Sequence, residues 1–148
     1  MTARVAFDTN ILVYAELEPE SDKGERAIEL TQVLAPRMIL AAQVALEFLA
    51  VVRRRAPEDL PRALDLVAWW RATLALAPTT DGIFDDAAGL IRSHRFQVWD
   101  AVIWTASRAA GARFLLSEDM HDGLELGGLT AINPFKRDMA ELLALIGR

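Results

Sequence analysis

Residues 4–10 of the chain read RVAFDTN, and this stretch decides the fold. The apolar run after Arg4 ends at Phe7, and its length and residue types predict a buried strand over Arg4–Phe7. Asp8 and the two polar residues after it are typical of turns and helix caps, so the strand ends there. An acid therefore stands directly at the carboxyl end of a buried strand.

Outward from this stretch, strand-length apolar runs alternate with helix patterns along the rest of the chain. No repeat, low-complexity segment or flexible linker divides it. The alternation predicts a single α/β domain over residues 1–148 with a mostly parallel sheet, in which ligands bind beyond the carboxyl ends of the strands. The other expected strands are 38–42, 74–77, 114–116 and 130–132, and the expected helices are 22–35, 44–55, 58–73, 81–96, 100–111 and 139–146.

The composition excludes several classes of protein. The chain has 148 residues, of which 53% are hydrophobic and 25% charged, as in compact globular domains. It has no cysteine, which excludes disulfides, thiolate zinc sites and cysteine nucleophiles, and fits a reducing compartment. The opening MTARVAF is too short for a signal peptide, and no apolar run approaches the roughly 20 residues of a membrane span. We therefore expect a cytoplasmic protein with no membrane partner.

The net charge of -5 argues against tight, non-specific binding of nucleic acid, because proteins that bind nucleic acid by bulk electrostatics are usually basic. Setting aside four acids discussed next leaves a charge of -1. Bound divalent cations would neutralise those acids further. The charge is therefore compatible with a metal-dependent nuclease.

Four acids stand where a solvated surface residue is not expected. Asp8 and Asp119 each follow a strand-length apolar run, Glu47 lies on or beside the apolar stripe of its helix, and Asp100 begins the stripe of another helix. Taken singly, the three aspartates are better explained as turn residues or caps, which stabilise by about 1 kcal/mol. A carboxylate on a buried face costs several kcal/mol unless it is paired, so Glu47 needs a metal or a salt bridge to a nearby arginine. All four point toward one end of the predicted sheet, which makes them a candidate site.

Clustered carboxylates repel one another, and one or more takes up a proton unless a cation is present. Oxygen ligands without Cys or a well-placed His suit Mg²⁺ or Mn²⁺ and not zinc. Such a cation can acidify an attacking water and neutralise the leaving oxygen in phosphodiester hydrolysis. The residues therefore indicate metal-dependent cleavage of a phosphodiester.

Four segments stand out in order along the chain: VAFDTNILVYA (5–15), QVALEFLAVV (43–52), VWDAVIWTAS (98–107) and LLSEDMHDG (115–123). Together they resemble the PIN-domain ribonucleases, and most closely the VapC toxins of bacterial toxin–antitoxin pairs. The resemblance covers essentially the whole chain in the right order, and INPF at 132–135 is similar to the end of many such toxins. It implies a PIN-like three-layer fold with a mostly parallel central sheet flanked by helices.

The resemblance also implies a role for each site residue. In chain order, Asp8, Glu47, Asp100 and Asp119 match the four metal-binding acids of the family. Gln43 stands where many members have Ser, and Glu118 or Asp122 lies close enough to replace Asp119. The supporting polar residues are Thr9, Asn10 and Ser117.

The family implies an endoribonuclease that cuts RNA with Mg²⁺, or with Mn²⁺, and acts as the toxin of a toxin–antitoxin pair. It implies a homodimer and a cognate VapB-type antitoxin whose tail occupies the active-site groove. Trp69 and Trp70 carry more apolar surface than one helix face would bury, so they either lie in a contact between two subunits or complete the core. The two histidines are expected at the surface. The sequence gives only a weak indication of an RNA groove, because runs of charge are more often solvated helix ends. The residues that would line such a groove are Arg53–Arg55, Arg92, His94 and Arg95.

Three rival interpretations remain. An aspartyl-phosphate phosphatase also has an Asp after its first strand, but Asn10 stands here in place of the second acid that such enzymes have two residues later. A receiver domain, which is phosphorylated on a similar Asp, needs a lysine near the last strand, and the only lysines are Lys23 and Lys136. A PIN-like protein that binds without cutting usually lacks one or more of the acids, and this chain keeps all four. Finally, the acids could be structural, in which case replacing them would destabilise the metal-free protein.

Overall fold

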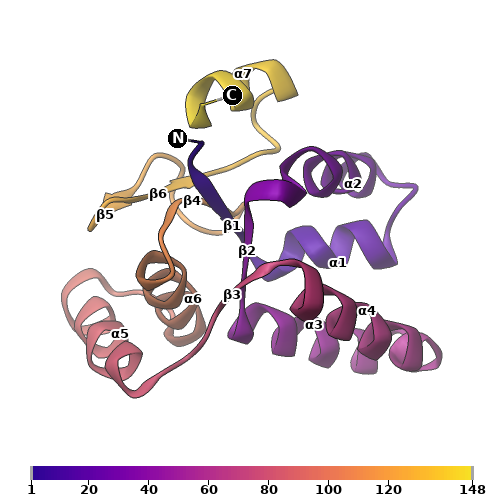
Figure 1. The fold of residues 1–148 in the computed structure, drawn as a ribbon, viewed down its shortest axis with the longest axis horizontal. Helices are drawn as coiled ribbons and strands as arrows, with labels where there is room; N and C mark the ends of the chain where they lie inside the picture. The colour runs from indigo at the N-terminus through magenta and orange to yellow at the C-terminus, as the bar shows by residue number, and fades with distance from the viewer. Residues whose placement is uncertain (1, 148) are drawn as a thin grey trace.

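A computed structural model describes residues 2–147, and the six strands of this part of the chain form one sheet in the order β3-β2-β1-β4-β6-β5 (Figure 1). Neighbouring strands are parallel except for β5, which runs antiparallel to β6. The predicted, mostly parallel α/β sheet is thus confirmed. The strands are β1 (Arg4–Phe7), β2 (Met38–Ala41), β3 (Ala75–Ala77), β4 (Ala112–Leu116), β5 (Glu125–Leu126) and β6 (Leu129–Ile132).

Helices flank both sides of the sheet, as the three-layer prediction requires. Figure 1 shows α1 and α2 on one side and α5 and α6 on the other, with α7 beside the N-terminal end. Short 3-10 turns at Ala35–Arg37 and Pro57–Asp59 precede β2 and α4, where proline interrupts regular α-helix. The α-helices are α1 (Thr9–Leu17), α2 (Asp22–Leu34), α3 (Ala42–Arg55), α4 (Leu60–Thr73), α5 (Asp81–His94), α6 (Val98–Ala109) and α7 (Met139–Ile146).

Most expected elements are present with ends shifted by a few residues, but three features differ. Helix α1 was not predicted, because Ile11, Leu12 and Val13 are consecutive buried residues without the periodicity of a half-exposed helix. Strand β5 is too short to give a sequence signal. Helix α6 begins at Val98, so the expectation that Asp100 begins or caps this helix is wrong, and Asp100 is its third residue.

The core lies on both faces of the sheet and around α3 and α4. Trp104 of α6 is fully buried, and Phe48 packs against Trp70 with ring centroids 5.1 Å apart. Trp70 therefore completes the core, whereas Trp69 is 59% exposed. None of the helices within residues 2–147 has the length and apolar character needed to cross a bilayer.

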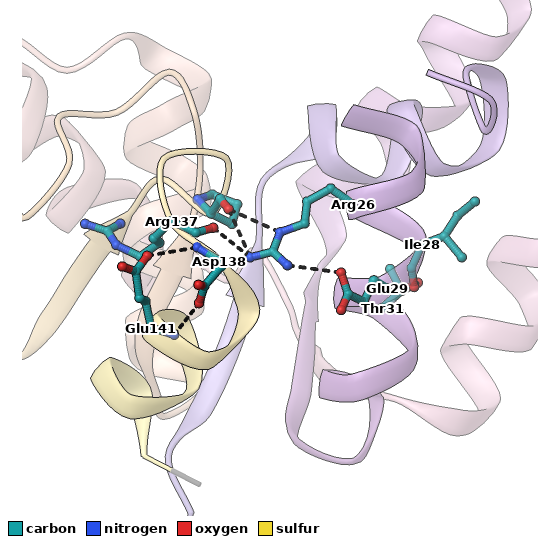
Figure 2. Close-up of polar contacts among 8 residues, drawn as sticks. Arg26, Ile28, Glu29, Thr31, Arg137, Asp138 and Glu141 are labelled. Carbon is teal, nitrogen blue, oxygen red and sulfur yellow. Dashed lines mark hydrogen bonds and ion pairs between the residues drawn. The ribbon is translucent and has the colours of Figure 1, made fainter. Parts of the chain in front are cut away.

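Arg26 of α2 joins this helix to the loop before α7 (Figure 2). Its guanidinium donates hydrogen bonds to the backbone oxygen of Arg137 at 2.8 Å and to that of Pro134 at 3.4 Å. Helix α7 then begins with a capping box, in which the Asp138 side chain accepts from the Glu141 backbone N–H at 2.8 Å and Glu141 reaches back to the Asp138 N–H. The hydrogen bonds of Arg26 thus fix the loop before α7 against α2.

Candidate active site

The four candidate acids line one cleft at the carboxyl ends of β1 and β4, between α3 and the first turn of α6. They come from four separate segments, and the parallel sheet brings those segments to one edge, as expected for the ligand sites of such sheets. The cleft has a volume of about 240 Å³. Its lining residues are Asp8, Thr9, Asn10, Glu47, Ala50, Val51, Arg54, Asp100 and Asp119.

Asp8 is the most deeply placed of the four and caps α1. One carboxylate oxygen accepts the backbone N–H of Thr9 at 2.8 Å, and the other accepts the Ser117 hydroxyl at 2.7 Å. Burial raises the pKa of Asp8, and the negative charges of Asp119 and Glu47 raise it further, while the two hydrogen bonds oppose the change. Asp8 is therefore fixed in orientation at a point where negative charge is unfavourable.

Glu47 is half-buried on α3 and is held from two sides. The Thr9 hydroxyl donates to its carboxylate at 2.5 Å and the Gln43 amide donates at 3.3 Å. The alternative of a salt bridge from Glu47 to a nearby arginine is not formed within residues 2–147. Thr9 thus orients two acids, Asp8 through its backbone and Glu47 through its side chain.

Asp100 faces the cleft from the third position of α6 and is half-buried. Burial, followed by the charges of Asp8, Asp119 and Glu47, raises the pKa of Asp100 to about 6. Asp119 is exposed and accepts a hydrogen bond from the Asn10 amide at 2.8 Å, and its own backbone N–H donates to the Ser117 hydroxyl at 3.2 Å. The cleft therefore concentrates negative charge, and none of its four acids forms a salt bridge within residues 2–147.

The two acids that compete with Asp119 in the sequence have other partners. Glu118 accepts hydrogen bonds from the Tyr14 hydroxyl and from the Lys23 ammonium, the latter at 2.6 Å. Asp122 accepts from the Arg137 guanidinium at 3.0 Å and from a backbone N–H at 2.8 Å. Neither side chain lines the cleft. These contacts favour Asp119 as the fourth acid of the site.

Asp122→Asn is expected to lower the free energy of unfolding by about 1–2 kcal/mol at pH 7. The hydrogen bonds from Arg137 hold the pKa of Asp122 below its ordinary value, so the charged form stabilises the folded state. This stabilisation is complete above a pH of about 4 and is lost as the pH falls through the lower, folded-state pKa. Denaturant unfolding at neutral and acidic pH measures it, with Asp119→Asn as the control. Equal stabilities of the two variants at pH 7 would contradict this structural role.

The residues of the cleft fit a hard divalent cation by the chemistry of their donors. Four carboxylates supply oxygen ligands only, and the raised pKa values of Asp8 and Asp100 reflect burial and the repulsion that a cation would relieve. Both histidines are exposed and lie outside the cleft. As the side chains are placed, no three acids or histidines within residues 2–147 are already arranged as a metal site. Ion binding at this cleft would therefore require the carboxylates to turn toward one another.

Both the sequence and the fold of the chain are similar to those of known proteins. A family model described as "PIN domain" matches residues 5–121, a span that contains all four acids. No match was found among curated proteins.

Solved structures resemble the chain at low sequence identity. VapC20 of Mycobacterium tuberculosis, described as a toxin that cleaves the sarcin-ricin loop, is 17% identical with a TM-score of 0.64, covering 78% of this chain and 89% of that one. A toxin–antitoxin complex from Klebsiella pneumoniae is 16% identical with a TM-score of 0.66, covering 88% and 97%. DNA-bound VapBC of Salmonella typhimurium is 13% identical with a TM-score of 0.63, covering 87% and 96%. At these identities the likeness shows a shared fold.

Proposed function

Because this chain belongs to the PIN domain family, we propose that it is a metal-dependent endoribonuclease and the toxin of a toxin–antitoxin pair. The observation that carries the proposal is the meeting of Asp8, Glu47, Asp100 and Asp119 in one cleft at the carboxyl edge of the sheet. Three of these acids accept hydrogen bonds from the polar residues beside them, Ser117, Thr9 and Asn10, which are the predicted supporting residues. The resemblance of the fold to VapC and other toxin structures supports the same assignment.

The four carboxylates would hold Mg²⁺, or Mn²⁺ in its place, and the cation would supply a more acidic bound water and neutralise charge on the phosphate. The protein contributes orientation. Ser117 and the Thr9 backbone fix the two oxygens of Asp8, and the Thr9 hydroxyl holds Glu47. Asn10 holds Asp119 at the open side of the cleft. These contacts hold the acids at the edges of one cleft, and their carboxylates would turn toward one another to bind a cation.

The proposal is tested by incubating purified protein with structured and unstructured RNA in the presence of Mg²⁺, Mn²⁺ or EDTA. We expect cutting that requires metal and that falls by about 100-fold or more in Asp100→Asn, since removing one electrostatic group of an active site has effects of this size. Asp65→Asn on α4 is the matched control, because it removes the same charge from an exposed position outside the cleft.

Two outcomes would contradict the nuclease assignment. Equal activity of the Asp100→Asn variant and the unaltered protein would show that a contaminant cuts the RNA. If neither protein cuts any RNA and calorimetric titration also detects no difference in Mn²⁺ binding between them, the cleft is not a metal-dependent active site.

We also propose that the protein acts in the cytoplasm as a homodimer and is inhibited by a VapB-type antitoxin. The absence of cysteine suits that compartment, and the structural neighbours include VapBC complexes. The exposed face of Trp69 on α4 offers apolar surface for a second subunit. If analytical sedimentation shows only monomer at micromolar concentration, the proposed homodimer is wrong.

A further inference from the structure

Arg54 is the one basic residue among those that line the acid cleft. It lies on the same face of α3 as Glu47, because Glu47, Ala50, Val51 and Arg54 follow the spacing of one helix face and all four line the cleft. Seven residues of α-helix rise about 10 Å, so Arg54 stands roughly two turns beyond the acid cluster. The cleft thus continues along α3 from a negative end to a positive one.

The guanidinium of Arg54 is free to bind a ligand, unlike those of Arg55 and Arg62. Arg55 pairs with Glu18 at 3.0 Å and Arg62 pairs with Glu16 at 3.8 Å. Arg54 is exposed and takes part in no ion pair or side-chain hydrogen bond within residues 2–147. Arginine keeps its charge at any physiological pH and binds phosphate oxygens through paired N–H groups.

The remaining basic residues that could contact RNA lie elsewhere. Arg53 is exposed but does not line the cleft, and Arg92 and Arg95 belong to the C-terminal end of α5. His94 lines a separate depression between α5 and α6. Since four carboxylates surround the reacting position, an RNA strand entering the cleft meets favourable charge from the protein at Arg54.

We propose that Arg54 is a substrate-positioning residue that binds a phosphate of the RNA beside the one that is cut. This inference rests on the proposed function. The distance along α3 separates Arg54 from the acids, so it contacts the strand next to the reacting phosphate and sets how the strand lies along the cleft. Its effect therefore falls on RNA binding and on KM, and the chemical step is left to the acids.

The first experiment measures binding without cleavage. The Asp100→Asn variant is titrated against a short fluorescein-labelled single-stranded RNA, by anisotropy, between about 50 and 200 mM salt, the range over which phosphate contacts change affinity strongly. Adding Arg54→Gln is expected to weaken binding about fivefold at the lower salt and to reduce the slope of log Kd against log salt by about 0.7, the value for one phosphate contact in a single strand. Adding Arg53→Gln, the matched control, should leave both quantities unchanged.

The second experiment measures cleavage with Asp100 present. Arg54→Gln is expected to raise KM by about the same factor as Kd and to leave kcat unchanged, whereas Arg54→Lys keeps a single charge and recovers part of the binding. Equal effects of Arg53→Gln and Arg54→Gln on the salt slope would overturn the inference in favour of bulk charge. Normal metal-dependent cleavage with an unchanged KM in Arg54→Gln would overturn it while leaving the nuclease intact. Absence of RNA binding by Asp100→Asn together with absence of metal-dependent cleavage by the unaltered protein would contradict both.

Discussion

Gly24→Ala is expected to lower the free energy of unfolding by more than about 3 kcal/mol, a large share of the stability of a domain of this size. Gly24 is the third residue of α2 and is buried against the chain that leaves α1. A Cβ atom there would lie 1.7 Å from the backbone oxygen of Glu18 and 2.9 Å from the Cα of Pro19. Both are backbone atoms, so no change of side-chain rotamer can relieve the overlap.

The backbone at Glu18 cannot move away without breaking the start of α2. The Glu18 oxygen accepts hydrogen bonds from the Ser21 backbone N–H at 3.1 Å and from the Ser21 hydroxyl at 2.7 Å. That hydroxyl also caps α2 by accepting the Gly24 N–H at 2.9 Å, and loss of such a cap costs about 1 kcal/mol by itself. Steric overlap and cap loss therefore act together.

Denaturant unfolding of the two alanine variants Gly24→Ala and Gly89→Ala measures this effect. Gly89 lies inside α5, and a Cβ there would meet no heavy atom within 4 Å. Gly89→Ala should therefore raise stability by about 0.5–1 kcal/mol, because alanine favours helix. If both variants were equally stable, the packing of α1 against α2 would not be as close as described.

Asp8→Asn is expected to lower the rate of RNA cleavage by about 1,000-fold or more and to leave the fold intact. Asp8 is the most buried acid of the cleft, and both of its carboxylate oxygens accept hydrogen bonds shorter than 3 Å, so its charge has a restricted position. Asparagine keeps the size of the side chain and an oxygen for the Thr9 N–H, but it lacks the negative charge. It also weakens the contact with Ser117, whose hydroxyl must stop donating.

The metal-free stability of Asp8→Asn separates a catalytic acid from a structural one. Because the folded-state pKa of Asp8 is raised, its ionised form destabilises the fold at every pH above its unfolded value of about 4, and a neutral residue removes that cost. The lost Ser117 hydrogen bond acts in the opposite direction by about 1 kcal/mol. Thermal melting in EDTA at pH 7 should therefore differ from that of the unaltered protein by only a few degrees. A severe loss of stability would show that the carboxylate is structural.

Much of the sheet and the positions of the acids could be predicted, because both depend on short-range patterns. Asp8 and Asp119 each follow a buried apolar run, and the carboxyl ends of parallel strands meet at one edge. Glu47 stood out because a charge interrupts an apolar stripe. The catalytic roles of these residues stay predictions until the cleavage experiments are made.

Other features depend on contacts between distant residues, which a single sequence does not specify. The partners of Glu118 lie in α1 and α2, and nothing near Glu118 in the sequence indicates that Tyr14 and Lys23 would bind it. Arg54 is one of three consecutive arginines, and only the packing of α3 shows that its side chain alone among them lines the cleft. Helix α1 was missed because the consecutive apolar residues from Ile11 to Val13 are all buried and so break the alternation of apolar and polar faces that marks a half-exposed helix.

The position of β1 between β2 and β4 also has a consequence for how the molecule is made. β2 follows β1 soon in the chain, but Ser117, which completes the surroundings of Asp8, lies 109 residues after it. Contacts over such separations form late and slowly, so a chain still emerging from the ribosome has β1 and β2 without Asp100, Ser117 or Asp119. For the proposed nuclease, this order of assembly leaves the cleft incomplete until translation has passed Asp119.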